Sequence, residues 1–492
     1  MTGADTDLAA FDAGRIAPAG FRDYDARWRY PEEIDQGGLR ALGLALGTQL
    51  HAHGLGEVIV GNDYRGYAPA VKDALILGLV RAGIAVHDIG TGLTPMAYFA
   101  RSHLGVPAVA MVTASHNPNG WTGVKMGLAP PLTHGPEEMA ELREIALSGT
   151  GAPRPGGGWR PVAGLREAWL ADVAGEARLA RPLRVVVATG NGGAGAFAPA
   201  LLSRLGAEVI GLHTDLDASF PHYNPNPESM EMLHDMGRAV REAGADLALG
   251  FDGDGDRCGV VDETGAEIFA DKMGLILARD WAGTHPGAHL VVDVKSTGLF
   301  ATDPVLAEAG ITTEIWKTGH SHMKRRVAET GALAGIEKSG HYFLAPPLGR
   351  GHDCALTAAR EICRLLDRHP GRPLSALAGD LPRSATSPTM SPACPDDEKR
   401  AVVARLTERL EGAAAAETPF AGRRIAQVIT VDGARVMLED GASALIRASS
   451  NTPNLVVVLE SPHGAEDLHT LLAEIDALLA AEPAIGAFDQ RL

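Results

Sequence analysis

The chain has 492 residues, of which 45% are hydrophobic and 21% are charged, as in ordinary soluble globular proteins. Its net charge of −17 leaves no basic excess to neutralise phosphates, so nucleic acid is not expected as a partner. A small anionic substrate is still compatible with this charge, because it senses only the local lining of a cleft. The length exceeds what one hydrophobic core accommodates, so we expect three or four domains.

The cysteines and the apolar segments indicate a reducing compartment away from membranes. Four cysteines occur far apart in the chain: Cys258, Cys354, Cys363 and Cys394. The sequence contains no Cys-x-x-Cys pair, so neither a zinc site nor a disulfide framework is indicated. The first 20 residues contain no apolar core of a signal peptide, and the apolar run at residues 74–80 is too short to span a membrane. We therefore expect a cytoplasmic protein without membrane contact.

The start of the chain alternates helical and strand patterns. Residues 21–31 mix aromatic and charged side chains without a period, which by itself suggests a functional loop or a salt-bridged cap. The elements expected next are a helix over residues 38–54, a strand over 57–60, a helix over 68–82 and a strand over 84–89.

One structural unit recurs three times. An apolar helix end, a glycine and a strand follow one another at Gly83, Gly206 and Gly310. Glycine commonly closes a helix because it adopts the left-handed conformation without a steric penalty. The repeats predict three related α/β domains of roughly a hundred residues each.

Domain boundaries are placed where the composition or the pattern changes. Residues 148–159 are dense in glycine and proline, whereas the boundary near residue 271 is marked only by the helical pattern that follows it. Residues 382–395, rich in serine, threonine and proline, are either a flexible linker or a strand entering the next domain. The expected domains are residues 1–155, 156–270, 271–385 and 386–492.

The last segment differs from the three repeats. The elements expected there are a helix over residues 396–411, strands near 425–430, 435–439, 444–447 and 455–459, and a helix over 465–481. This order is typical of a small α+β domain.

Three carboxylates alternate with glycines in one short stretch. Asp252, Asp254 and Asp256 bring together negative charges that repel one another unless a cation lies among them. Oxygen ligands without cysteine or histidine favour a hard cation such as Mg²⁺ or Ca²⁺. With Glu263 at the twelfth position the spacing also suits an EF-hand, but Arg257 stands where that loop needs glycine, and the flanks read as strands.

A second polar loop follows the apolar strand at residues 108–112. It reads Thr-Ala-Ser-His-Asn-Pro and places Ser115 at the C-terminal end of a strand, where α/β sheets carry reacting groups. A plain Asn-Pro turn is the alternative. A Ser-His-Asp triad is not expected, because adjacent Ser115 and His116 would not normally face each other. Lys125, ten residues on, is a candidate for proton transfer or phosphate binding.

Residues 190–195 match the G-x-G-x-x-G pattern of dinucleotide binding. They follow a strand, precede a helix and have Asp215 twenty residues beyond Gly195. Close packing in any α/β unit produces a similar glycine-rich turn. Nicotinamide binding therefore stays open as an alternative.

Two further loops carry groups suited to a phosphosugar. Residues 335–341 set Glu337, Ser339 and His341 between glycines, which suits sugar hydroxyls, although a solvated turn reads the same way. Residues 447–453 combine a guanidinium with several hydroxyl and amide donors after a strand, which suits a phosphate dianion.

Together the four loops resemble those of the α-D-phosphohexomutase family. The motifs, in chain order, are Thr-Ala-Ser-His-Asn-Pro, Asp-Gly-Asp-Gly-Asp-Arg, Glu-x-Ser-Gly-His and Arg-x-Ser-x-x-x-Pro, one in each expected domain. The resemblance covers nearly the whole chain and is strongest to the bacterial phosphomannomutase/phosphoglucomutase branch. It implies an α/β fold of three related domains with mixed sheets and a smaller C-terminal α+β domain around a central cleft.

The resemblance also implies roles for individual residues. Ser115 corresponds to a phosphoserine that gives and regains the phosphoryl group, and its phosphate completes a Mg²⁺ site made by the three aspartates of residues 252–256. Arg257 and Lys125 correspond to positions near the transferred phosphate. Either Lys125 or His341 is a candidate for the base that deprotonates the attacking hydroxyl.

Positions that correspond to substrate contacts lie in the first, third and fourth expected domains. They are Tyr24, Arg27, Lys295, His320, Glu337, Lys338, Ser339, Arg447, Ser449, Ser450, Asn451 and Thr452. Lys338 stands where a neutral residue is usual and Asn451 where threonine is usual, so the preferred sugar stays open.

The resemblance implies an isomerase that interconverts hexose 6-phosphate and hexose 1-phosphate of mannose or glucose through hexose 1,6-bisphosphate. We expect a monomer or homodimer whose partner is the phosphosugar. Two other classes stay open from the residues alone: an NAD-dependent oxidoreductase using residues 190–195, and a non-catalytic protein that binds sugar phosphate or Ca²⁺.

Overall fold

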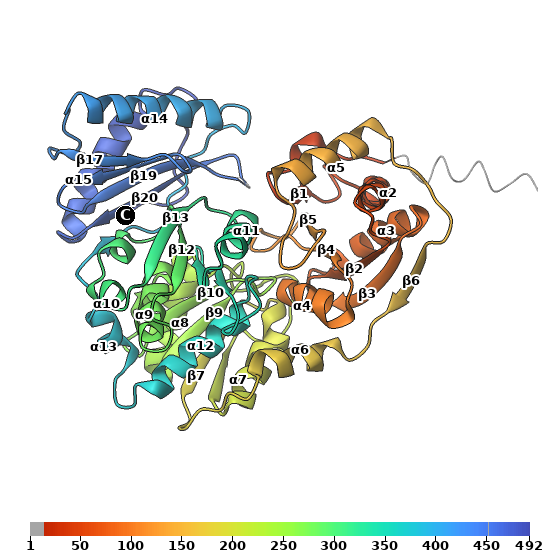
Figure 1. The fold of residues 1–492 in the computed structure, drawn as a ribbon, viewed down its shortest axis with the longest axis horizontal. Helices are drawn as coiled ribbons and strands as arrows, with labels where there is room; N and C mark the ends of the chain where they lie inside the picture. Colours follow the sequence, from red (N-terminus) through yellow and green to blue (C-terminus); the bar gives the residue numbers. More distant parts are fainter. Residues whose placement is uncertain (1–13, 451) are drawn as a thin grey trace, which may run out of the picture. The chain divides into compact units, whose positions relative to one another are not determined.

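A computed structural model describes residues 14–450 and 452–492 (Figure 1). The described chain divides into two compact units. The first contains the residues up to Glu267 together with His341–Leu374, and the second contains Ile268–Gly340 and Ser375–Leu492. No helix in the described ranges is long and apolar enough to cross a membrane.

The first sheet of the first unit has the strand order β1-β5-β4-β2-β3-β6. Its strands are β1 (Ala26–Arg29), β2 (Glu57–Asn62), β3 (Ala85–Thr91), β4 (Ala108–Val112), β5 (Trp121–Gly127) and β6 (Gly158–Pro161). Strands β2, β3, β4 and β6 are parallel, and β5 is antiparallel to both β4 and β1. The sheet is therefore mixed, as expected.

Three helices share one hydrophobic core with this sheet. They are α2 (Gln36–Ala52), α3 (Ala68–Arg81) and α5 (Pro136–Ser148). Alternate residues of the strands, such as Val58 and Val60 of β2, face this core because side chains on a strand point to opposite sides in turn. Helix α4 (Thr94–Leu104) precedes β4 and contacts both β2 and β4.

The second sheet of this unit has the order β11-β10-β9-β7-β8. Its strands are β7 (Arg184–Ala188), β8 (Glu208–Leu212), β9 (Leu247–Phe251), β10 (Cys258–Asp262) and β11 (Glu267–Ile268). The unit also contains α6 (Leu165–Ala174), α7 (Ala198–Leu205), α8 (Met230–Ala243), β15 (Tyr342–Leu344) and α12 (Ala355–Arg368), and α13 (Leu374–Gly379) follows in the chain.

The second unit begins with a third α/β region. Parallel strands β13 (Thr312–Trp316), β12 (His289–Asp293) and β14 (Ala334–Ile336) lie in that order, with α9 (Ala270–Ala282), α10 (Pro304–Glu308) and α11 (His320–Thr330) around them. Gly83, Gly206 and Gly310 have φ of 85°, 100° and 68°, each between a helix and a strand. The predicted repeat of helix, left-handed glycine and strand is thus confirmed.

An antiparallel C-terminal sheet completes the second unit, with the order β16-β20-β19-β18-β17. Its elements are β16 (Ala385–Thr386), α14 (Lys399–Ala415), β17 (Ile425–Ile429), β18 (Ala434–Leu438), β19 (Ser443–Ala448), β20 (Leu455–Ser461) and α15 (Ala465–Leu479). Figure 1 shows α14 and α15 against this sheet. Because β16 pairs with β20, the segment left open as linker or strand enters the C-terminal sheet as a strand.

The two faces of the C-terminal sheet pack against different partners. Alternate residues of β20, including Val457 and Leu459, share a core with α14 and α15. Leu445, Val456 and Val458 point to the opposite face and pack with Val294, which follows β12. Hydrophobic burial therefore joins the C-terminal sheet to the third α/β region inside the second unit.

Two polar loops occupy equivalent places in the first unit. Residues 113–120 connect the parallel strand β4 to the antiparallel strand β5, and residues 252–257 connect parallel β9 to antiparallel β10 in the same way. Each loop thus lies at the carboxyl end of a parallel strand, where the chain reverses. This is the edge at which α/β sheets gather functional groups.

Candidate active site

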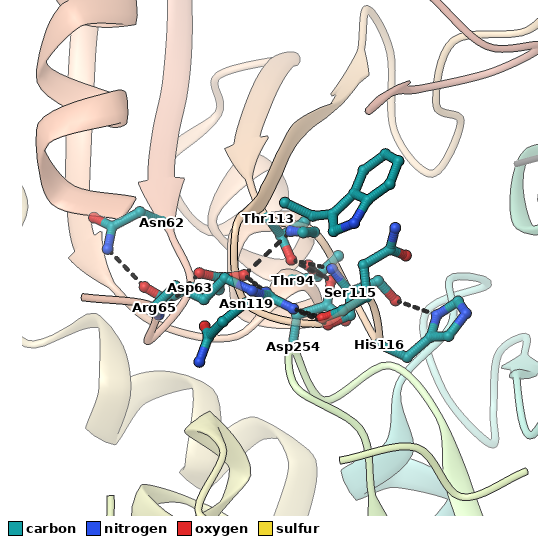
Figure 2. Close-up of polar contacts among 12 residues, drawn as sticks. Asn62, Asp63, Arg65, Thr94, Thr113, Ser115, His116, Asn119 and Asp254 are labelled. Carbon is teal, nitrogen blue, oxygen red and sulfur yellow. Dashed lines mark hydrogen bonds and ion pairs between the residues drawn. The ribbon is translucent and has the colours of Figure 1, made fainter. Parts of the chain in front are cut away.

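The Ser115 loop is held in an unusual backbone conformation. Ser115 has φ of 51°, a left-handed value that costs a residue with a Cβ roughly 1–2 kcal/mol. Its N–H donates to Thr113 Oγ1 at 2.8 Å, and its carbonyl accepts from Arg65 Nη2 at 2.9 Å. Arg65 also donates to the carbonyl of Asn117 and pairs with Asp63 (Figure 2). These contacts offset the strain and fix the backbone at Ser115.

Ser115 and His116 contact each other, although their adjacency in the sequence predicts that they do not. Ser115 Oγ lies 3.4 Å from His116 Nδ1, and Figure 2 shows the two side chains turned together. The left-handed backbone at Ser115 accounts for this, because it redirects the side chain relative to an extended loop. Burial, and then the positive charges of Arg257 and Arg27, hold the pKa of His116 well below 6.5.

The loop of residues 252–257, called the metal loop below, carries three fully buried carboxylates. Asp252, Asp254 and Asp256 each offer one oxygen, and these oxygens all lie within 4.8 Å of one another. Gly253 is required here, since a Cβ at this position would lie 2.7 Å from the carbonyl oxygen of Ser115. The missing side chain therefore lets the metal loop approach the Ser115 loop.

Hydrogen bonds join the two loops directly. Ser115 Oγ donates to Asp252 Oδ2 at 3.2 Å, and Thr113 Oγ1 donates to Asp254 Oδ2 at 3.1 Å. Thr94, at the first turn of α4, also donates to Asp254 Oδ2 (Figure 2). Both loops belong to the first unit, so a serine hydroxyl is held at the edge of a carboxylate cluster.

Lys125 supplies a buried positive charge to this cluster. Its side chain is 1% exposed, and Nζ lies 2.8 Å from Asp254 Oδ2 and also pairs with Asp256. Although burial acts in the opposite direction, these two carboxylates raise the pKa of Lys125 above its usual value. Burial and the neighbouring Asp256 and Asp254 raise the pKa of Asp252 well above its usual range.

The carboxylates fit a hard divalent cation. Asp254 Oδ1 is buried and has no hydrogen-bond donor among the described residues, so it is available to a metal ion. An all-oxygen donor set suits Mg²⁺, Ca²⁺ or Mn²⁺ better than softer ions. The acidic cluster expected from the sequence can therefore bind a metal in this fold.

Arg257 and His341 lie beside the same cluster. Arg257 Nη1 contacts Glu228 Oε2 at 3.1 Å, and the backbones of Arg257 and His341 form an isolated β-bridge. His341 Nε2 lies 3.2 Å from Asp256 Oδ1 and 3.8 Å from Asp353 Oδ2. A guanidinium and an imidazole are thus placed at the metal loop.

Within residues 21–31, only Ala26–Arg29 form a strand, β1, which lies at the edge of the first sheet. Tyr24 and Arg27 are both 3% exposed, and Arg27 lies on β1. Arg27 pairs with Asp25 at 2.9 Å and donates to the carbonyl of Thr113 at 3.3 Å. The structure therefore connects this segment to the base of the Ser115 loop.

The remaining predicted substrate positions lie in the second unit. Glu337 Oε1 accepts from the N–H of Gly319 at 2.6 Å, and Glu337 Oε2 accepts from Ser339 Oγ at 3.0 Å. The loop before His320 and the loop after β14 are therefore hydrogen-bonded to each other. Lys295 and His320 are 7% and 5% exposed, and each follows or begins an element of the third α/β region.

The Lys338 side chain is buried beside an aromatic ring and a carboxylate. Its Nζ lies 4.3 Å from the centre of the Phe269 ring and 3.9 Å from Asp271 Oδ2. Burial lowers the pKa of Lys338. The side chain packs at the start of α9, while its N–H donates to Asp293 Oδ1 at 3.1 Å.

The predicted phosphate-binding residues follow β19. Arg447 Nη2 donates to Ser450 Oγ at 3.1 Å, and the hydroxyls of Ser449 and Thr452 lie 2.8 Å apart. Asn451 lies outside the described residues. A guanidinium and three hydroxyls are therefore gathered at the end of one strand.

The glycines of residues 190–195 serve close packing. A Cβ at Gly193 would lie 2.5 Å from the Tyr64 ring, and one at Gly195 would lie 2.2 Å from the carbonyl oxygen of Thr214. The segment continues into a short 3₁₀ helix, η2 (Gly193–Ala196), before α7 begins. The glycine pattern is explained without a dinucleotide.

Sequence reasoning assigned no function to Asp63, Arg65 and Thr94, which the structure places against the Ser115 loop and the metal loop. Asp63 and Arg65 follow directly after β2, a position that also predicts functional groups. Thr94 carries no such signal, because it reaches Asp254 across 160 residues of sequence.

Domain models of the phosphoglucomutase/phosphomannomutase family match the chain in order. The α/β/α domain I matches residues 18–151, domain II residues 167–265, domain III residues 269–384, and the C-terminal domain residues 394–478. The chain belongs to the phosphoglucomutase/phosphomannomutase family. The predictions of this family and of its fold class, three α/β domains and a smaller C-terminal domain, are confirmed.

Individual relatives agree with this assignment. A Pseudomonas putida protein named phosphomannomutase/phosphoglucomutase is 33% identical over 446 residues, which cover 91% of this chain and 92% of that protein. A Neisseria gonorrhoeae phosphoglucomutase is 32% identical over 442 residues, covering 90% and 92%. A solved structure of a Burkholderia thailandensis family protein superposes with a TM-score of 0.84 at 31% identity, covering 96% of this chain and 99% of that one. The prediction of an isomerase of the hexose-phosphate mutase class is confirmed.

Proposed function

We propose that this chain interconverts hexose 6-phosphate and hexose 1-phosphate, of mannose, glucose or both, through a phosphoserine at Ser115. The observation that carries the proposal is the 3.2 Å contact between Ser115 Oγ and Asp252 Oδ2 beside two further buried carboxylates. A serine held against a metal-type carboxylate cluster suits phosphoryl transfer, because alignment and charge neutralisation dominate that reaction.

The proposed reaction has two balanced transfers. The C1 hydroxyl of hexose 6-phosphate attacks the phosphorus on Ser115, so the bond from phosphorus to Oγ breaks while a bond to O1 forms. The hydroxyl proton passes to a base, and hexose 1,6-bisphosphate results. After the bisphosphate reorients, Ser115 Oγ attacks the phosphorus on O6, so that a bond to Oγ forms while the bond to O6 breaks. The base returns its proton to O6, which leaves hexose 1-phosphate and restores the phosphoserine.

The first unit would carry out the chemistry. Asp252, Asp254 and Asp256 would hold Mg²⁺, which when bound withdraws charge from the phosphoryl oxygens. Lys125 and Arg257 would stabilise the negative charge that spreads over these oxygens. His341 would be the base, since it lies at the metal loop, whereas the carboxylates that raise the pKa of Lys125 would keep that side chain a charged ammonium.

The second unit would recognise the substrate. Arg447, Ser449, Ser450 and Thr452 would bind the phosphate that does not react, because a guanidinium with several hydroxyls matches a phosphate dianion. Binding energy from this remote phosphate would then hold the sugar hydroxyl in position for attack. Other proposed substrate contacts in the second unit are Lys295, His320, Glu337, Lys338, Ser339 and Asn451, and the first unit would add Tyr24 and Arg27.

The proposal includes finer points that the sequence raised. We propose that the protein binds a phosphosugar and does not bind nucleic acid. We also propose that it is a cytoplasmic monomer or homodimer, and that hexose 1,6-bisphosphate is both its activator and its reaction intermediate. The four buried free thiols are compatible with a reducing compartment. The proposed domain limits are residues 1–155, 156–270, 271–385 and 386–492.

Intact-mass measurement tests the phosphoserine. Purified protein is incubated with glucose 1,6-bisphosphate and Mg²⁺, and the mass gain of one phosphoryl group is followed in the wild type and in Ser115→Ala. The wild type should gain one group and Ser115→Ala none, with loss of turnover. Ser102→Ala, which removes an exposed hydroxyl on α4, should behave like the wild type. A phosphorylated or active Ser115→Ala protein would refute the proposal.

A further inference from the structure

We propose that Asp432 is a positioning residue that orients Arg447 toward the substrate's non-reacting phosphate and ties it to the loop before His320. The inference rests on the proposed function, in which Arg447 binds that phosphate. Asp432 belongs to none of the motifs that identify the family here. It lies in the turn between β17 and β18, and it joins two segments that are more than a hundred residues apart.

One carboxylate oxygen makes both contacts. Asp432 Oδ2 accepts from Arg447 Nε at 2.7 Å and from the N–H of Thr318 at 3.1 Å. The guanidinium is planar and its donors point in fixed directions, so a bond at Nε fixes the plane of the whole group. Ser450 Oγ accepts from a second donor of the same guanidinium, Nη2, at 3.1 Å. Arg447 is therefore oriented before a phosphate arrives.

The backbone places this carboxylate with little freedom. Gly433, the next residue, has φ of 80°, and a Cβ there would lie 2.3 Å from the carbonyl oxygen of Ile446. The same Cβ would lie 2.7 Å from the Cα of Arg447. The turn is thus pressed against the strand that carries Arg447, and only glycine permits this approach.

The other end of the contact leads into the sugar-recognition loops. Thr318 Oγ1 donates to Asp293 Oδ2 at 2.8 Å, and the N–H of Gly319 donates to Glu337 Oε1 at 2.6 Å. Asp293 Oδ1 in turn accepts from the N–H of Lys338. A continuous set of hydrogen bonds therefore connects Arg447, through Asp432, to the loop that carries Glu337.

This connection has a chemical consequence. A carboxylate beside Arg447 reduces the net positive charge offered to a phosphate, so Asp432 is not placed to maximise phosphate affinity. Its contribution is to hold the guanidinium and the sugar loop in one fixed geometry. A bound phosphate then aligns the sugar hydroxyl, and displacement of such a contact by about 1 Å can cost about a hundredfold in rate.

The test compares two acceptors for the phosphoryl group of the phosphorylated enzyme. Hexose 1-phosphate carries the remote phosphate, whereas the free hexose lacks it. In Asp432→Ala, kcat/KM for hexose 1-phosphate should fall about 10- to 100-fold, while transfer to the free hexose stays within about twofold of the wild type. The ratio that matters is kcat/KM for hexose 1-phosphate divided by kcat/KM for the free hexose. Asp432→Asn keeps an oxygen that can accept from both donors, so its ratio should lie within about threefold of the wild-type ratio.

A matched control and a second variant keep the test decisive. Asp440 lies in the next turn of the same sheet and pairs with Arg423 and His463; its side chain is 26% exposed, against 21% for Asp432. Asp440→Ala should leave the ratio of the two acceptors unchanged. If Asp432→Ala does not fold, Asp432→Glu, which moves the carboxylate by one methylene, should lower the ratio by more than about threefold and up to about the hundredfold misplacement effect given above.

The outcomes separate this proposal from the function on which it rests. An unchanged ratio in Asp432→Ala or Asp432→Glu, an equal fall for both acceptors, or an equal loss in Asp432→Asn and Asp432→Ala overturns the role of Asp432. If instead the wild type never becomes phosphorylated at Ser115, the proposed function itself fails.

Discussion

Replacing Lys125 with methionine tests whether this ammonium is the internal counter-charge of the metal loop. Nζ is buried between Asp254, at 2.8 Å, and Asp256. Methionine keeps most of the side-chain volume but removes the charge, so the carboxylates lose their buried partner. Removing one member of a buried ion pair costs about 3–5 kcal/mol of stability. In EDTA, with about 2 °C per kcal/mol for a large domain, the midpoint of thermal unfolding should fall by about 6–10 °C.

Mg²⁺ should reverse much of this loss. A divalent cation among Asp252, Asp254 and Asp256 supplies the positive charge that methionine lacks, and it binds only the folded cluster. The midpoint of Lys125→Met should therefore rise more with Mg²⁺ than that of the wild type, recovering at least about half of its deficit. The same experiment should show Mg²⁺ acting at a lower concentration in the variant, because no ammonium competes for the carboxylates.

Lys72→Met is the matched control. Lys72 Nζ lies 2.6 Å from Asp88 Oδ2, and both side chains are less than 10% exposed, but neither belongs to the metal loop. This variant should lose stability equally in EDTA and in Mg²⁺. Scanning calorimetry of the three proteins under both conditions gives the comparison. If Lys125→Met shows the same deficit with and without Mg²⁺, Lys125 does not serve as the counter-charge of a metal site.

Two further predictions concern buried groups outside the chemistry. Burial lowers the pKa of His134 from 6.5 to about 4. Between these two pH values the unfolded chain binds a proton at this histidine and the folded chain does not. About 3 kcal/mol of the free energy of unfolding, present above pH 6.5, is therefore lost as the pH falls toward 4. Urea unfolding at pH 7 and pH 4.5 should show a smaller loss in His134→Gln than in the wild type, and equal losses would contradict the assignment. Arg435 and Glu460 form a buried pair at 3.4 Å, and Arg435 also donates to the carbonyl of Ser296. Arg435→Met or Glu460→Gln alone should cost about 3–5 kcal/mol, and the double variant less than the sum; strict additivity in urea unfolding would show that the pair is not coupled.

The sequence predicts the fold well where local pattern decides it. Strand β9 (Leu247–Phe251) and strand β10 (Cys258–Asp262) flank the aspartate loop as expected, because a continuous apolar run bounded by glycine is a strong strand signal. The same signal locates β4 (Ala108–Val112) before Ser115. The positions of the loops that carry the motifs follow from these strands, because each loop begins where its strand ends.

Contacts between distant segments are the part that sequence reasoning misses. Thr94 and Arg65 reach the two loops only after the sheet brings α4 and the end of β2 alongside β4. Neither residue lies in a recognisable motif, and no local period encodes the contact. His116 is a related case. Its contact with Ser115 depends on the left-handed φ of Ser115, and this angle is not predictable from the sequence because residues other than glycine rarely adopt it.

The proposed chemistry places different demands on the phosphoryl-transfer loops and on the phosphate-binding loop. Transfer to and from one serine requires a fixed centre. The Ser115 loop and the metal loop would supply it in the proposed mechanism, because they lie at equivalent strand ends in the first unit and are hydrogen-bonded to each other. A bisphosphate intermediate must present either phosphate to that centre, so the group that holds the other phosphate has to accept both orientations of the sugar. An arginine with hydroxyl donors meets this requirement, because it recognises charge and phosphate shape irrespective of which carbon bears the group. In the proposed mechanism, the hydrogen bonds that connect Arg447, through Asp432 and residues 318–319, to Glu337 would hold the phosphate-binding and sugar-binding groups in one geometry for both orientations.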